Sequence, residues 1–146
     1  MKHLIFSVVA MFAIVLVQSC ANEPSCKLEG QWKVENCDIQ SAKLSPTIVN
    51  MAKDEYLSNT YEFQPEGKFV IHQEADTKIT INGSYTFDDA TQTLSWETQN
   101  DNGSTGHEEF QVTSCTGSAI TLNQRLPNDP QKEEIATVTL TLSKVQ

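Results

Sequence analysis

The sequence is poor in positive charge. It has one arginine, Arg125, among 146 residues, and its formal net charge at pH 7 is −9. Nucleic-acid binding needs clustered lysines and arginines that contact phosphates, so we expect no nucleic-acid partner. The same deficit argues against the chain acting as a peripheral binder of anionic lipid. We expect the acidic surface to serve solubility.

The sequence also lacks motifs for metal binding and for nucleophilic catalysis. It contains no C-x-x-C, no closely spaced histidine pair and no G-x-S-x-G. His72 and His107 each neighbour acidic residues, but neither has the spacing of a metal site. Strand alternation places His72 opposite Phe69 and Ile71, which favours a solvent-facing position. We therefore expect no metal, no cofactor and no enzymatic activity.

A long apolar run occurs only at the N-terminus. Lys2 and His3 precede it, and the run from Leu4 to Val17 is interrupted only by Ser7. A transmembrane helix needs about 20 apolar residues, which is more than this run provides. A basic start, an apolar centre and a small residue before the cut are typical of a secretory signal. We interpret residues 1–19 as a signal peptide.

The junction Ser19-Cys20 resembles the lipobox of bacterial lipoproteins, although Gln18 stands where a small residue is commoner. The resemblance implies that Cys20 is lipidated and becomes the mature N-terminus. Residues 20–27 then form a polar tether, and residues 28–146 form one domain. Such a protein is anchored through its lipid to a membrane of the bacterial cell envelope, and we expect the outer membrane, facing the periplasm or the cell surface.

After residue 28, apolar and polar side chains alternate with a period of two, which indicates half-buried strands. Pro65-Glu66-Gly67 predicts a turn between two of them. The expected strands are Gly30–Glu35, Thr60–Phe63, Lys68–His72 and 77–87, followed by four around Leu94 and Trp96, Phe110 and Val112, Ile120 to Leu126, and Val138 to Leu142.

The dipeptide Asn82-Gly83 is typical of hairpin turns. A turn at this point would mix apolar and polar side chains on both faces of the hairpin. An unbroken strand instead puts Ile81, Tyr85 and Phe87 on one face. We therefore predict one strand over residues 77–87, with Gly83 as a bend or bulge, and a turn at residues 88–91.

One helix is expected between the first two strands. Ser45 is a good N-cap residue, and Pro46 suits the first helical position. Ile48, Ala52 and Tyr56 follow at helical spacing, with Val49 beside them. The pattern predicts a helix of ten to twelve residues that covers one opening of the fold.

Eight strands in hairpin succession predict an all-β, eight-stranded antiparallel up-and-down barrel with one short helix. A flattened β-sandwich is the alternative. An eight-stranded barrel is wide enough either to be filled by side chains or to hold one small ligand.

The inward-facing side chains are the candidate ligand site, with Tyr85 and Trp96 as polar groups. They are Tyr61, Phe63, Phe69, Ile71, Ile79, Ile81, Tyr85, Phe87, Trp96, Phe110, Val112, Ile120, Leu122, Val138 and Leu140. Because many are aromatic, a filled core competes with a ligand cavity.

Gly30-Gln31-Trp32 resembles the G-x-W signature of lipocalins, and Gly83 to Phe87 and Leu140 to Lys144 resemble later segments of lipocalin-like domains of bacterial lipoproteins. The resemblance implies an eight-stranded barrel, often with an apolar ligand inside. It also implies a basic residue packed on Trp32 near the end of the last strand. Arg125 lies one strand too early, so Lys144 is the better match.

If Cys20 carries lipid, Cys26, Cys37 and Cys115 remain. In a barrel, Cys26 precedes the first strand and Cys115 ends the sixth, so both lie at one end, and Cys37 lies near the other. This placement predicts a Cys26–Cys115 disulfide, with three free thiols as the alternative.

These features favour a lipid-anchored, lipocalin-like barrel that binds a small apolar or amphipathic molecule. The alternative is a non-catalytic surface module with a filled barrel that contacts a protein or a glycan.

Overall fold

The computed structural model describes residues 26–74, 78–99, 103–127, 129 and 131–146. The expected signal peptide, Cys20 and the tether up to residue 25 lie outside the described residues. Within those residues, no helix is long and apolar enough to cross a bilayer.

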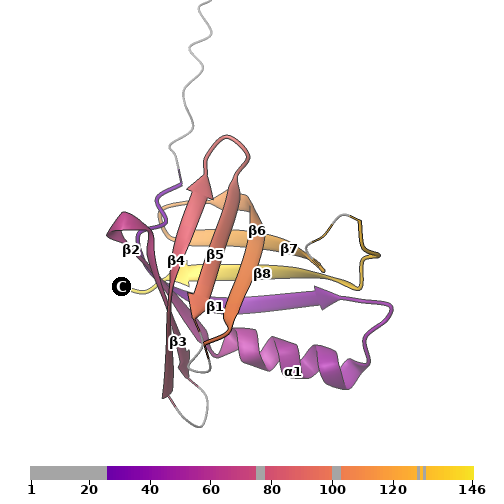
Figure 1. Cartoon of the computed structure of the whole chain (residues 1–146). Coiled ribbons are helices and arrows are strands. Elements are labelled where there is room, and N and C mark those ends of the chain that lie inside the picture. The colour runs from indigo at the N-terminus through magenta and orange to yellow at the C-terminus, as the bar shows by residue number, and fades with distance from the viewer. Residues whose placement is uncertain (1–25, 75–77, 100–102, 128, 130) are drawn as a thin grey trace, which may run out of the picture.

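Eight antiparallel strands close into a barrel (Figure 1). The elements are β1 (Gly30–Gln40), α1 (Pro46–Leu57), β2 (Asn59–Gln64), β3 (Lys68–Glu74), β4 (Lys78–Asp88), β5 (Thr93–Gln99), β6 (Thr105–Cys115), β7 (Ala119–Leu126) and β8 (Ala136–Lys144), with a single 3₁₀ turn at Pro65–Gly67. Each strand pairs with its neighbour in the chain, and β1 also pairs with β8, so the predicted barrel is confirmed.

β1 is longer than the alternation suggested. The sequence pattern stops at Glu35 because β1 has a bulge between Val34 and Asn36, opposite β8. The extra residue shifts the phase, so that Trp32 and Val34 are buried before the bulge and Cys37 and Ile39 are buried after it. A strict period of two therefore misses the second half of the strand.

β4 is continuous, as predicted. Gly83 pairs in register with Phe69 on β3 and with Thr98 on β5, so the expected bulge at Gly83 is wrong. The glycine is needed for close approach instead, because a Cβ placed on it would overlap the backbone of Glu97. The predicted turn follows at Asp88, whose Oδ1 accepts the backbone N–H groups of Ala90 and Thr91 at 2.9 and 3.3 Å.

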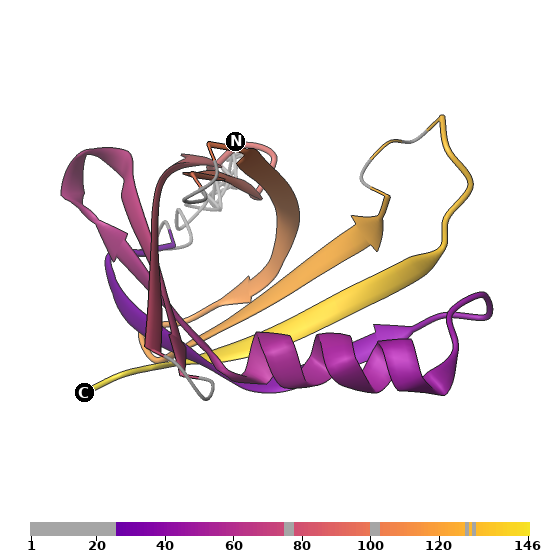
Figure 2. The ribbon, with the colours of Figure 1, turned by 60° about the horizontal axis from the view of Figure 1, so that its bottom comes forward.

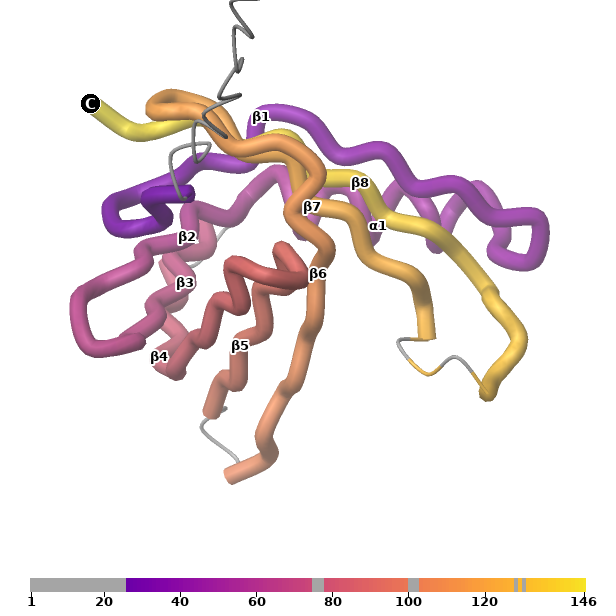
Figure 3. Tube along the Cα trace, turned by 90° about the horizontal axis from the view of Figure 1, so that it is seen from above, coloured from indigo at the N-terminus to yellow at the C-terminus, as the bar shows by residue number. Residues whose placement is uncertain are grey.

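The two ends of the barrel differ. The pairing of β6 with β7 covers Gln111–Cys115, and that of β1 with β2 covers only Gly30–Lys33. Beyond these pairs β7, β8 and the second half of β1 diverge from the other strands (Figures 2 and 3). The ring of eight strands is therefore complete only near the start of β1.

α1 lies beside the half of β1 that β2 leaves unpaired (Figure 2). Ser45 caps it as predicted, its side chain accepting the N–H of Ile48 at 3.4 Å. Val49, Ala52 and Tyr56 pack against the core. Ile48 does not join them, because it is 52% exposed, so its expected place on the packing face is wrong.

Candidate functional site

Aromatic rings fill the centre of the barrel. The Trp96 ring stacks between Phe69 and Phe110, with centroids 4.8 and 4.7 Å apart, and Tyr61 lies 5.2 Å from it. Phe63 contacts Phe69 at 5.1 Å. All five side chains are at most 2% exposed. The middle of the predicted ligand site is thus occupied by the protein's own side chains.

The other predicted interior positions fall into two groups. Val112, Ile120, Leu122, Val138 and Leu140 are buried in the same core, whereas Ile71, Ile81, Tyr85 and Phe87 are partly exposed. Ile79 is 44% exposed, and its assignment to the interior is wrong. It lies near the start of β4, where it pairs with Gln73 on β3 but precedes the first β4–β5 pair at Asn82.

A pocket of about 550 Å³ opens at the end of the barrel where β1 begins. Its lining consists of Cys26, Lys27, Leu28, Glu29, Tyr85, Phe87 and Lys144. Tyr85 and Phe87 are the two predicted interior residues that reach it, because they lie in the last part of β4, at the end of the barrel where β1 begins. Tyr85 packs edge-on against Phe63, with centroids 5.0 Å apart, so the pocket floor is the aromatic core.

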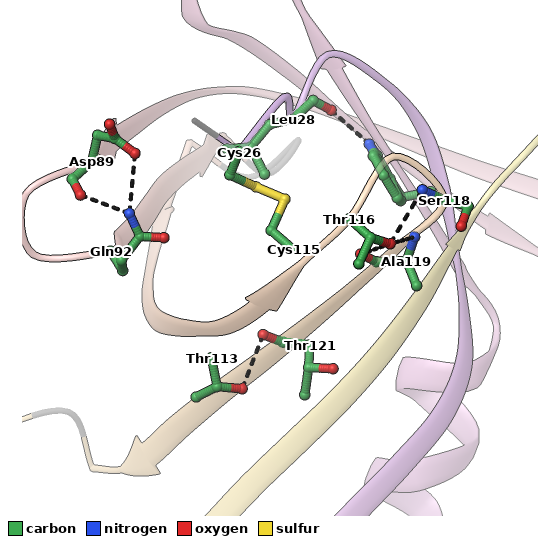
Figure 4. The surroundings of a disulfide bond; sticks show 11 residues. Cys26, Leu28, Asp89, Gln92, Thr113, Cys115, Thr116, Ser118, Ala119 and Thr121 are labelled. Carbon is green, nitrogen blue, oxygen red and sulfur yellow. Dashed lines mark hydrogen bonds between the residues drawn. A yellow bond between two sulfur atoms is a disulfide. The ribbon is translucent and has the colours of Figure 1, made fainter. Parts of the chain in front are cut away.

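A disulfide fixes one wall of this pocket. Cys26 is bonded to Cys115 at the end of β6, with Cα atoms 5.6 Å apart, which confirms the predicted pairing (Figure 4). Among the residues that the structure describes, Cys37 is the one free thiol, and it is buried near the other end. Burial raises its pKa to about 11, with a smaller opposing effect from Lys53.

Charged groups surround the pocket mouth. Lys27, Glu29 and Lys144 are exposed. Lys144 Nζ lies 5.2 Å from the centroid of the Trp32 ring, so the contact expected from the lipocalin signature is made by Lys144. Burial, and to a lesser extent the charge of Glu29, raises the pKa of the Tyr85 hydroxyl, which therefore stays protonated as a hydrogen-bond donor at neutral pH.

A polar cluster that sequence reasoning missed lies at the opposite end. Burial, and to a lesser extent the charge of Glu55, raises the pKa of Glu108 from 4.5 to about 7. Burial and the charge of Glu108 raise the pKa of Tyr56 and Tyr61, which places these groups near one another. The sequence did contain a signal for Glu108. Strand alternation puts it on the same face of β6 as Phe110 and Val112, which are buried.

Two amide groups accompany this cluster. Asn59 and Gln124 are 8% and 4% exposed, and among the described residues neither side-chain oxygen has a hydrogen-bond partner. Glu108 and Gln124 lie on β6 and β7 just beyond the pair Gln111 and Asn123, where the pairing of these two strands stops. Polar side chains thus line the region where the barrel ring is incomplete, in contrast to the aromatic floor of the disulfide end.

His72 faces outward, as expected from alternation. His72 Nε2 lies 2.9 Å from Glu62 Oε2, and hydrogen bonds from His72, Gln64 and Gln31 lower the pKa of Glu62. His72 also lines a second hollow of about 470 Å³ on the outer wall over β1 to β4. His107 Nδ1 is 3.9 Å from Glu97 on the exposed face of the sheet.

Comparison with known proteins adds evidence about the fold. No protein-family model and no curated protein matches the sequence. Among solved structures, a lipocalin-like protein from Bacteroides uniformis superimposes with a TM-score of 0.51 at 17% identity, covering 81% of this chain and 98% of that one. The chain has a lipocalin-like fold. An uncharacterized protein from Bacteroides eggerthii superimposes with a TM-score of 0.52 at 16% identity, covering 82% of this chain and 100% of that one.

Proposed function

We propose that this protein is a lipid-anchored, non-catalytic binding protein of the bacterial cell envelope. Its lipocalin-like barrel binds a small amphipathic molecule in the pocket beside the disulfide. The observation that carries the proposal is this pocket of about 550 Å³, which combines the rings of Tyr85 and Phe87 with the ammonium groups of Lys27 and Lys144.

The size and lining of the pocket support a small ligand. Small-molecule sites in proteins commonly measure about 300–1,000 Å³ and pair apolar walls with a few polar groups. The stacked rings around Trp96 block the barrel centre, so the ligand sits at the mouth of the barrel. Its apolar part contacts Tyr85 and Phe87, and its polar part reaches the lysines.

The anchor is proposed from the sequence alone. The apolar run before Ser19-Cys20 resembles a lipoprotein signal, and lipidation of Cys20 would hold the protein at a membrane, with the outer membrane as the proposed location. Mass spectrometry of the envelope fraction tests it. We expect an acylated N-terminus at Cys20, and loss of membrane attachment in the Cys20→Ala variant.

Ligand binding is tested by native mass spectrometry of the protein purified from its own host and by thermal shifts with a library of amphiphiles. Phe87→Ala removes an apolar wall of the pocket, and we expect it to weaken binding about tenfold or more. Ile79→Ala, an exposed apolar position outside this pocket, is the matched control and should bind as the wild type does. Equal weakening by both variants would contradict the assignment of the pocket.

The alternative is a surface module that contacts a protein or a glycan. The aromatic filling of the barrel favours it, because the core at Trp96 needs no ligand for its packing. The two functions give different results in the same experiments. If no molecule co-purifies and no amphiphile stabilises the protein, the binding proposal fails and the surface module is favoured.

A further inference from the structure

The pocket beside the disulfide lies where the chain leaves the barrel toward its N-terminus. Cys26 is part of the pocket lining, and its bond to Cys115 ties this exit point to the end of β6 (Figure 4). Five residues separate Cys26 from Cys20 in the sequence. Six Cα–Cα steps span at most about 20 Å, whatever path they take.

This short reach restricts how the barrel sits at a membrane. The inference rests on the lipid anchor of the proposed function, because it requires an acyl group on Cys20. With that anchor, the wall of the pocket stays within about 20 Å of the lipid surface. The helix end of the barrel lies at the far end of β1, eleven residues long, so the tether sets no such limit on its distance from the lipid surface.

The charge at the pocket differs from that of the whole chain. The formal net charge of the protein is −9, but the pocket lining has two lysines, Lys27 and Lys144, and one acid, Glu29. A lysine near an anionic membrane surface contributes about 1 kcal/mol of attraction. The acidic groups elsewhere oppose general adsorption, and the short reach from Cys20 keeps Lys27 close to the membrane.

The pocket also has an apolar part beside these charged groups. Leu28 is buried beneath the rim, and the rings of Tyr85 and Phe87 are partly exposed. We infer that the pocket faces the anchoring membrane and takes from it a single-chain amphiphile with an anionic head group. The acyl chain lies against Tyr85 and Phe87, and the head group lies beside Lys27 and Lys144.

Photo-crosslinking in vesicles tests this inference. The full-length lipidated protein, with a benzophenone amino acid in place of Phe87, is reconstituted into phosphatidylcholine vesicles that contain a minority of lysophosphatidylglycerol. We expect irradiation to yield an adduct with the lysolipid, identified by mass spectrometry. The same probe at Ile48, 52% exposed on α1 at the other end, should yield none. A probe at Glu29, exposed at the rim, tests the same face without altering an aromatic wall.

A pair of matched variants tests whether the positive charge at the pocket mouth is needed to bind the anionic head group. Lys27→Glu should lower the adduct yield at residue 87 on the order of tenfold, because it reverses one of two positive charges at the mouth. Lys78→Glu makes the same change in net charge at the start of β4, away from this pocket, and should leave the yield unchanged. Replacing lysophosphatidylglycerol with lysophosphatidylcholine should lower it at least fivefold.

Several outcomes would overturn the inference. Equal adducts at residues 87 and 48 would exclude a membrane-facing pocket, and equal yields from the two lysolipids would exclude an anionic head group. If detergent-solubilised protein binds soluble amphiphiles in the pocket but forms no adduct in vesicles, this inference fails and the proposed function stands. If it binds in neither setting, both fail.

Discussion

Lys144 and Trp32 join the last strand to the first at one contact. Lys144 Nζ from the last strand lies 5.2 Å from the centroid of the Trp32 ring on the first strand. Gly30 belongs to the same contact, because a Cβ on it would lie 3.0 Å from Lys144 Cε, and its φ of +125° disfavours any other residue. The Trp32 indole N–H donates to the Leu28 carbonyl at 2.6 Å, so the ring is held from both sides.

Replacing Lys144 should weaken the closure of the barrel. We expect Lys144→Gln to lower the free energy of unfolding by about 0.5–1 kcal/mol through loss of the cation–π contact, and Lys144→Arg to retain it. Urea denaturation measures the change. Lys33→Gln, on the outward face of β1, is the control and should change stability by less than about 0.5 kcal/mol. Similar losses for Gln and Arg at position 144 would contradict a role for the charge.

Reduction of the Cys26–Cys115 disulfide should destabilise the fold. The bridge joins residues separated by 89 positions, and a loop of this size is expected to contribute about 4–5 kcal/mol by restricting the unfolded chain. Urea denaturation with and without a reductant measures this difference. The Cys26→Ser/Cys115→Ser variant should match the reduced protein and show no further response to reductant. An unchanged midpoint on reduction would exclude the bridge from stabilising the barrel.

Gly83→Ala should disturb the pairing of β4 with β5. The added methyl would overlap the backbone of Glu97, so we expect a loss of about 1–3 kcal/mol in the free energy of unfolding. Gly117→Ala is the matched control, since nothing lies within 4 Å of its added Cβ. It should be neutral or slightly stabilising. Thermal denaturation measures the stability of both variants. Equal losses of stability would contradict close approach to Glu97 and would point to the flexibility of glycine as the reason for Gly83.

The raised pKa of Glu108 predicts a pH dependence of stability. A carboxyl with a pKa of 4.5 when unfolded and about 7 when folded binds more protons in the folded state between these values. The contribution of Glu108 to the free energy of unfolding is therefore complete below about pH 4.5 and is lost as the pH rises through 7. Glu108→Gln should remove this loss and raise the free energy of unfolding at pH 8 by about 1–3 kcal/mol.

Urea denaturation across this pH range measures the effect of Glu108→Gln. Glu109→Gln is the control, because the neighbouring side chain points to the other face of β6. It should keep the pH dependence of the wild type. A pH dependence that persists in Glu108→Gln would place its origin elsewhere.

The regular parts of the fold could be predicted because their information is local. Alternation identified β4 as one strand despite Asn82-Gly83, and capping placed the start of α1 at Ser45 and Pro46. The direction of successive strands then placed Cys26 and Cys115 at one end. The second half of β1 could not be predicted in this way, because the bulge after Val34 changes which residues face inward.

The candidate site was predicted only in part. Tyr85 and Phe87 were identified as inward-facing, and both line the pocket. The rest of the pocket comes from Cys26, Lys27, Leu28, Glu29 and Lys144, which lie before the first strand and at the end of the last. Nothing in the local pattern relates these two segments, because only the pairing of β1 with β8 brings them together.

The sequence by itself determined the class of fold, the strand order and which face of most strands turns inward, and it favoured Cys26 with Cys115 as the pair if a disulfide forms. These features follow from the period of apolar residues and from the direction of neighbouring strands, which are set within a few residues of chain. Only the tertiary structure decided that the interior is filled around Trp96, that α1 replaces β2 beside half of β1, and that Glu108 is half-buried near Tyr56. Such outcomes depend on how side-chain volumes from distant strands fit into one closed space, and that fit is not encoded in any single segment.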